Sequence, residues 1–404
     1  MFRNKAVIIG VLSVACLVSL ASLGYQRYIG TRGAALETQC EQALEANEWG
    51  KLEEVAYEWA QLEPDKALPW IYAAEGANNQ SKPVQTGVYL SMLPDDDERS
   101  PRALLELSHL QFWDFNQPIA AEETYKRILN MDVWTENNVA FRREAHRRLI
   151  FYYAMSRQRN RIIEEANRAI EGGFDVPETY IYLIGADWMT FTNGAEMNNR
   201  WLMTNPGYEP FVVARSYHMV RTSALAQEED SKSIGLMEKN QMLMDGMLES
   251  YPHNLEILAF HVSQATLGGN QKRVAELLSG APASIADDSR FWRAKGTVHA
   301  GRQELEEAEK AYLKALELHP YDWQAQHELA AIYRLKDDFE TVKKYQASSM
   351  LGKELRRDIL QMPSTINIDP DILDRMIMFT EASGKKDVAD KLRARVAQKK
   401  ATNS

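Results

Sequence analysis

Arginine side chains gather in one short stretch of this chain, where they could hold carboxylate groups. Eight arginines stand against three glutamates there, a local net charge of +5 (8 − 3): Arg142, Arg143, Arg147, Arg148, Arg157, Arg159, Arg161 and Arg168. A guanidinium binds a carboxylate through two parallel hydrogen bonds, which suits it to an acidic peptide or a chain terminus. The alternative is that these arginines are solvated or paired with acids of neighbouring helices.

Residue patterns that carry catalysis or hold metals are absent from the sequence. It has no glycine-rich phosphate loop, no H-E-x-x-H, no C-x-x-C and no G-x-S-x-G. The eight histidines are scattered, and the run Asp95–Glu98 lacks the spaced oxygens and glycine turn of a calcium loop. We therefore expect a protein that is not an enzyme and that uses no cofactor, no metal and no small-molecule substrate.

The elements that position such side chains are clearest between Ser289 and Pro320. Apolar and small residues recur there at three- and four-residue steps, which predicts helices over Ser289–Ala300 and Glu304–Leu318. Six residues are expected to pack this hairpin: Trp292, Gly296, Ala308, Tyr312, Ala315 and Pro320. The small ones let the two helices approach closely, the aromatic rings fill the space beside the contact, and the proline stops the second helix.

These residue types and spacings resemble the tetratricopeptide repeat (TPR). A hairpin of this size cannot bury its apolar face alone and must stack on neighbours. Weaker copies in the same register start near Ala43, Arg102, Arg143, Pro177, Leu255 and Trp323. Residues 190–250 break the register, and Lys295 and His299 depart from the family's apolar and aromatic preferences. The resemblance implies an all-α fold, a right-handed superhelical solenoid of antiparallel helix pairs.

In the TPR family the first helix of each pair lines a concave groove that holds a partner. The resemblance implies that Glu106 and Trp113 face this groove in one unit, and Arg147 and Phe151 in the next. Arg143 is grouped with Arg147 as the grip on a protein partner with an acidic segment. The overall charge of -10 argues against nucleic acid, whose binding needs a basic face.

An uncharged apolar run at the N-terminus predicts one transmembrane helix ahead of the repeats. Ala6–Gly24 follows Arg3 and Lys5, precedes Arg27, and spans roughly 28 Å as a helix, close to the thickness of a bilayer core. A retained anchor is favoured because the run is longer than the apolar region of a cleaved signal peptide. A cleaved secretory signal, or a lipoprotein attached through Cys16, remains an alternative.

The charges that flank this run slightly favour a cytoplasmic N-terminus and an exported body. Sparse cysteine and the lack of long disordered tracts fit a single-pass protein of the bacterial inner membrane with its repeat domain in the periplasm. The sequence thus predicts a membrane-anchored scaffold for protein–protein interaction at the cell envelope. The alternatives are a helical-toroid enzyme acting on glycans and a structural component of a secretion or assembly complex.

The chain is expected to have three parts. Residues 1–32 hold the anchor with its flanks, residues 33–355 the repeat array, and residues 356–404 the closing helices. The basic stretch 385–400, with seven basic and two acidic residues, is predicted to be a helix that caps the array. A role of this stretch at a membrane surface is the alternative.

Overall fold

The structure, a computed structural model, describes the backbone of residues 2–226, 233–362 and 364–403. Side chains are described over these ranges except at 2–23, 222–226, 233–234, 236–237, 399–400 and 402–403. All regular elements within the described residues are helices, as the sequence predicts, and no strand occurs among them. The chain divides into two compact units, residues 1–145 and 146–404, and each is described by itself.

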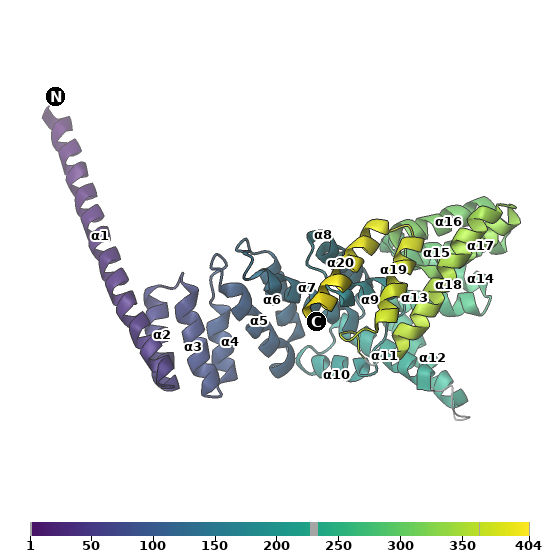
Figure 1. The fold of residues 1–404 in the computed structure, drawn as a ribbon, viewed down its shortest axis with the longest axis horizontal. Helices are drawn as coiled ribbons and strands as arrows, with labels where there is room; N and C mark the ends of the chain where they lie inside the picture. Colours follow the sequence, from purple (N-terminus) through teal and green to yellow (C-terminus); the bar gives the residue numbers. More distant parts are fainter. Residues whose placement is uncertain (1, 227–232, 363, 404) are drawn as a thin grey trace. The chain divides into compact units, whose positions relative to one another are not determined.

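The first unit is a series of helices joined by short turns (Figure 1). They are α1 (Phe2–Glu45), α2 (Trp49–Leu62), α3 (Ala67–Asn79), α4 (Pro83–Ser91), α5 (Ser100–His109), a π-helical segment (Leu110–Asp114) and α6 (Pro118–Leu129). Consecutive helices pack on one another, and α2 and α4 begin 34 residues apart. Gly76 permits a close approach of two helix backbones, because a Cβ there would lie 2.7 Å from the backbone nitrogen of Glu53 on α2.

The second unit contains the remaining helices, with α7 (Val139–Met155) crossing the division between the units. They are α8 (Arg159–Gly172), α9 (Pro177–Gly185), α10 (Gly194–Thr204), α11 (Glu209–Ala226), α12 (Ser233–Ser250), α13 (Leu255–Leu267), α14 (Gln271–Ser279), α15 (Ser289–Gly301), α16 (Leu305–Leu318), α17 (Trp323–Leu335), α18 (Phe339–Gln361), α19 (Pro370–Ala382) and α20 (Lys386–Asn403).

Three consecutive hairpins of the second unit keep an unbroken 34-residue register. Helices α13, α15 and α17 begin at residues 255, 289 and 323, and α14, α16 and α18 begin at 271, 305 and 339. The same position caps the first helix each time, since the side chains of Asn254, Asp288 and Asp322 accept backbone N–H bonds. This register is that of a TPR-like repeat.

The hairpin of α15 and α16 shows how small residues set the contact between its helices. A Cβ on Gly296 would lie 2.5 Å from Cε1 of Tyr312, so only glycine fits against this ring. Tyr312 is fully buried with Ala308 and Ala315, and all three pack against α17. Trp292 is half-buried on the same cluster, and α16 ends two residues before Pro320.

The C-terminal helices return to earlier parts of the second unit. Helices α19 and α20 pack against α9, and Leu392 and Val396 of α20 are buried (Figure 1). Lys391 donates to the carbonyl oxygen of Ile170 at 2.9 Å. Helix α18 runs without a break through the boundary expected at residues 355–356, so the closing helices continue directly from the last repeat. The described part of residues 190–250, expected to be irregular, contains α10, α11 and α12, which lie outside the 34-residue register.

Over the residues that are described, no helix is both long and apolar enough to cross a bilayer. The predicted membrane segment is residues 6–24, and of these the structure describes the side-chain environment of Gly24 alone. The anchor and the right-handed superhelical course of the whole chain stay predictions.

Candidate functional site

The five residues predicted to line a groove divide between the two units. Glu106 lies on α5, Trp113 in the π-helical segment and Arg143 on α7, all within the first unit. Arg147 and Phe151 also lie on α7 but belong to the second unit. Their assignment to one common groove therefore stays a prediction, and each group is treated within its own unit.

Two arginines of the basic stretch already pair with acids inside the protein. Arg147 lies 3.4 Å from the carboxylate of Glu178 on α9, and Arg168 pairs with Glu164 and Glu165 on its own helix. Phe151 makes an edge contact with Phe191, at 6.1 Å between ring centroids. For these arginines, pairing inside the protein accounts for the charge without an acidic partner.

Two further arginines of the stretch enter a buried ion-pair network of the second unit. Arg157 lies 2.7 Å from Glu256 on α13 and donates to the carbonyl oxygen of Met189. Glu256 also receives two hydrogen bonds from Arg290 on α15, at 2.7 and 3.1 Å. Arg290 in turn binds Asp288, the capping residue of its own helix.

The network continues from α8 to α17. Arg159 lies 2.5 Å from Asp187 and 3.6 Å from Asp288. Arg293 on α15 binds Asp322, the capping residue of α17, and lies 3.8 Å from Asp187. Successive hairpins are thus joined by charge pairs as well as by apolar seams.

Burial makes the pairing in this network obligatory. Burial alone raises the pKa of the Asp187, Glu256 and Asp288 carboxyls, but the neighbouring arginines outweigh it and leave all three pKa values lowered. Arg290, although buried, has a raised pKa because Asp288 and Glu256 bind it. All these groups stay charged at neutral pH, so the network holds the fold and offers no proton donor for catalysis.

The first unit presents a different surface, made by the first helix of each pair. Its polar residues repeat at 34-residue steps: Glu41 and Glu75 occupy one position, and Tyr72 and Glu106 another. Burial raises the pKa of Tyr72, and the negative charges of Glu41, Glu37 and Glu75 raise it further. Helices α1, α3 and α5 therefore bring these carboxylates within electrostatic reach of one another. We call Glu37, Glu41, Tyr72, Glu75 and Glu106 the acidic face.

Positive charge is scarce on the acidic face. Arg102, one turn from Glu106, has its Nε 3.9 Å from that carboxylate, and both side chains are mostly exposed. Partial burial raises the pKa of Glu106; Arg102 partly offsets this, and Glu75 adds to the rise. Among the described side chains, no basic group forms an ion pair with Glu37, Glu41 or Glu75. The carboxylates repel one another, so a positively charged partner would stabilise the face.

Trp113 lies one helical segment beyond Glu106, and its side chain is 37% exposed. Its ring packs edge-on against buried Phe112, at 4.9 Å between centroids. The π-helical turn at Leu110–Asp114 adds a residue to the helix and so changes the direction of the side chains after it. The residue types of this turn are those of a continuing helix, so helical periodicity does not predict it.

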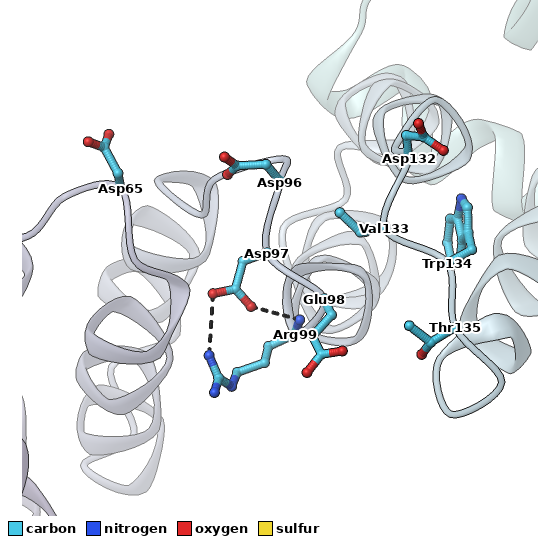
Figure 2. A pocket seen from close by; sticks show the side chains of 9 residues that line it. All are labelled: Asp65, Asp96, Asp97, Glu98, Arg99, Asp132, Val133, Trp134 and Thr135. Carbon is cyan, nitrogen blue, oxygen red and sulfur yellow. Dashed lines mark hydrogen bonds and ion pairs between the residues drawn. The ribbon is translucent and has the colours of Figure 1, made fainter.

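A second acidic area of the first unit lies at the loops between hairpins. A shallow hollow there has a volume of about 640 Å³. Figure 2 shows the side chains that line it: Asp65, Asp96, Asp97, Glu98 and Asp132, together with Arg99, Val133, Trp134 and Thr135. Asp97 binds the backbone and the guanidinium of Arg99, and adjacent Asp95 binds Arg127 at 2.6 Å. In the part of the chain that is described, no three His, Cys, Asp or Glu side chains converge to hold a metal ion.

The chain matches no protein-family model and no curated protein. Solved structures similar to it include MamA 41-end from Desulfovibrio magneticus RS-1, with 15% identity, a TM-score of 0.28, and coverage of 50% of this chain and 96% of that one. Yeast Tom70 has 12% identity, a TM-score of 0.28, and coverage of 90% and 76%. The human IFIT1 dimer with PPP-AAAA has 11% identity, a TM-score of 0.31, and coverage of 88% and 95%. At these identities and TM-scores the likeness assigns no function to this chain.

Proposed function

We propose that this protein is a membrane-tethered helical-repeat scaffold whose first unit binds a basic segment of a partner protein. The observation that carries the proposal is the acidic face, where carboxylates of three successive first helices repel one another and, among the described side chains, only Glu106 pairs with a cation, Arg102 at 3.9 Å. A Lys- or Arg-bearing segment laid across α1, α3 and α5 would relieve that repulsion. Complementary charge of this kind steers a partner and fixes its orientation.

The tether is proposed at residues 6–24, inside the inner membrane of a bacterium, with the repeats on the periplasmic side. Helix α1 supports it, because its backbone is one helix from Phe2 to Glu45. The far end of this helix is held firmly, since Leu36, Cys40 and Ala43 are buried on the side that packs against α2. A membrane segment at the near end would therefore connect to the first hairpin without a flexible linker.

A glycan-active enzyme finds less support in the charges of the chain. Glycoside hydrolysis needs a carboxylic acid that keeps its proton near neutral pH, together with a second carboxylate across the cleft. The buried carboxyls Asp187, Glu256 and Asp288 have lowered pKa values, so they lack that proton. A structural component of an envelope complex would use the same surface as the scaffold. The two roles differ only in whether the partner stays bound permanently.

Affinity capture tests the proposal. The full chain is solubilised from membranes, captured and examined by mass spectrometry, beside a variant with Glu75→Lys and Glu106→Lys. The matched control carries Glu54→Lys and Glu123→Lys, which make the same charge change at exposed sites on α2 and α6. We expect the partner to be lost from the acidic-face variant and kept by the control, with binding that weakens as salt rises. Equal capture by both variants would contradict the proposal.

A further inference from the structure

A cavity of about 340 Å³ lies within the second unit, among α11, α13, α15, α17 and α18. Its size is that of a pocket for a small ligand. Part of its wall is apolar or aromatic, and includes Tyr217, Phe260 and Trp323. The charged residues on the wall are Arg221, Arg290, Arg293, Arg356, Asp187, Glu256 and Glu328.

Two of the four arginines on the wall belong to the buried network, and two do not. Arg290 binds Glu256, and Arg293 binds Asp322. Arg221 on α11 lies 5.4 Å from the ring centroid of Tyr217 and 5.9 Å from that of Phe260. Of the carboxylates whose side chains are described, none forms an ion pair with Arg221 or Arg356.

Arg221 and Arg356 lie close enough to repel each other. Burial lowers the pKa of the Arg356 guanidinium, and the positive charge of Arg221 lowers it further. Tyr217 compensates Arg221 and raises the pKa of its guanidinium, whereas at Arg356 burial and the charge of Arg221 outweigh the effect of Tyr217, so an anion between the two groups would stabilise Arg356.

The wall of the cavity carries one positive charge that no described carboxylate balances. Within the network, four arginines balance four carboxylates: Arg157, Arg159, Arg290 and Arg293 against Asp187, Glu256, Asp288 and Asp322. Outside it, two arginines face a single carboxylate, that of Glu328, so the excess is +1 (2 − 1). A monoanion neutralises this excess, whereas a phosphate dianion would overshoot it in a site of low dielectric constant.

We propose that this cavity binds one carboxylate group between Arg221 and Arg356, with the apolar body of the ligand against Tyr217, Phe260 and Trp323. The guanidinium groups supply paired hydrogen bonds of the kind that planar carboxylates accept. The carboxylate comes from a free aromatic or aliphatic acid, or from the C-terminus of a protein segment. The site does not depend on the acidic face, which lies in the first unit and attracts the opposite charge.

Isothermal titration of the purified full chain tests the chemistry of the ligand. The probes are N-acetyl-L-phenylalanine, its amide, phenyl phosphate and a short peptide that ends in phenylalanine. Saturable binding of one equivalent of the acid, with no binding of the amide and weaker binding of the phosphate, is expected. If the peptide binds more tightly than the acid, the natural ligand is the C-terminus of a protein. If the acid binds more tightly, the natural ligand is a free acid. Failure of both acid and peptide to bind in the millimolar range overturns the proposal.

Arg356→Gln separates ligand binding from a structural role. We expect it to weaken binding of the probe by about tenfold or more and to leave the melting temperature unchanged or raised, since it removes the repulsion with Arg221. Arg302→Gln, an exposed arginine at the turn after α15, is the matched control and should change neither quantity. A variant of Arg356 that melts at a lower temperature and binds the probe normally would show that the arginine is structural.

Discussion

Arg290 donates two hydrogen bonds to the carboxylate of Glu256, which lies 34 residues earlier in the chain. The two residues occupy equivalent positions in the first turns of α15 and α13, so the pair joins one repeat to the next. Arg157 binds the same carboxylate from the turn before α8. One buried acid thereby holds three segments of the second unit together.

Glu256→Gln should strongly destabilise the second unit. The amide keeps the shape of the side chain but leaves Arg157 and Arg290 buried with too little negative charge. Breaking a buried pair in this way costs about 3–5 kcal/mol. Urea unfolding, followed by circular dichroism, measures the change.

The control for this variant is Glu276→Gln on α14. Glu276 pairs with Arg273 at 3.5 Å, and both side chains are exposed. Loss of an exposed pair costs about 0–1 kcal/mol. Equal effects of the two substitutions would show that the network contributes no more than a surface pair.

Gly296→Ala tests the contact between α15 and α16. The new methyl group would lie 2.5 Å from Cε1 of Tyr312, and this fully buried ring has little room to move. We expect a loss of about 1–3 kcal/mol in the free energy of unfolding. Gly246→Ala on α12 is the control: no atom lies within 4 Å of its Cβ position, so alanine there should stabilise the helix by up to about 1 kcal/mol. A neutral Gly296→Ala would mean that the hairpin is looser than the contact implies.

The hairpin of α15 and α16 could be predicted because its signal is local. Small and aromatic residues at helical spacing determine which faces meet, whatever surrounds them. The hairpin of α3 and α4 escaped prediction, although Trp49 and Pro83 begin their helices in the same register. Gly76 of α3 packs against the backbone of α2 in the preceding hairpin, and a single glycine in a helix carries little signal.

The partners of charged residues could not be predicted in the same way. The basic stretch suggested a surface that grips an acid, but Arg157 and Arg159 are buried against Glu256 and Asp187. Glu256 lies far along the chain from Arg157. Helical periodicity predicts which face of a helix a residue lies on, but not which other helix packs against that face. Only the pair Glu256 and Arg290 could be inferred from the sequence, because the two residues are 34 positions apart. That inference is possible only after the 34-residue repeat has been recognised.

The free energy of unfolding should fall as the pH drops from about 6.5 to about 4. Burial lowers the pKa of His218 and of His319 to about 4, whereas histidine in the unfolded chain titrates near 6.5. Over that window the two histidines are protonated in the unfolded chain but neutral in the folded one. The free energy of unfolding therefore falls by up to about 1.4 kcal/mol for each histidine per unit decrease in pH. Above the window both states are neutral at these sites and the effect disappears.

His319→Phe should remove about one proton from this pH dependence. Both ring nitrogens of His319 are buried and make no hydrogen bond with any described residue, so phenylalanine can take its place without losing a bond seen there. His327→Phe, at an exposed site on α17, serves as the control. Urea unfolding at several pH values gives the slope for each variant. An unchanged slope in His319→Phe would show that this histidine is protonated in the folded chain over the same range as in the unfolded one.

Arg395→Gln should release α20 from the second unit. Its guanidinium binds both carboxylate oxygens of Asp175 at 3.0 Å and donates to the carbonyl oxygen of Gly173 at 2.7 Å. Asp175 is fully buried and accepts one other side-chain hydrogen bond among the described residues, from Tyr180. Without Arg395 its carboxylate would stay buried with no positive charge to balance it. Amide hydrogen exchange in α20 should therefore become faster than in α13, which does not touch this pair. Arg393→Gln, whose partners Glu381 and Asp390 are exposed, should leave the exchange of α20 nearly unchanged. If both variants exchange alike, apolar burial of Leu392 and Val396 holds the helix and the ion pair adds little.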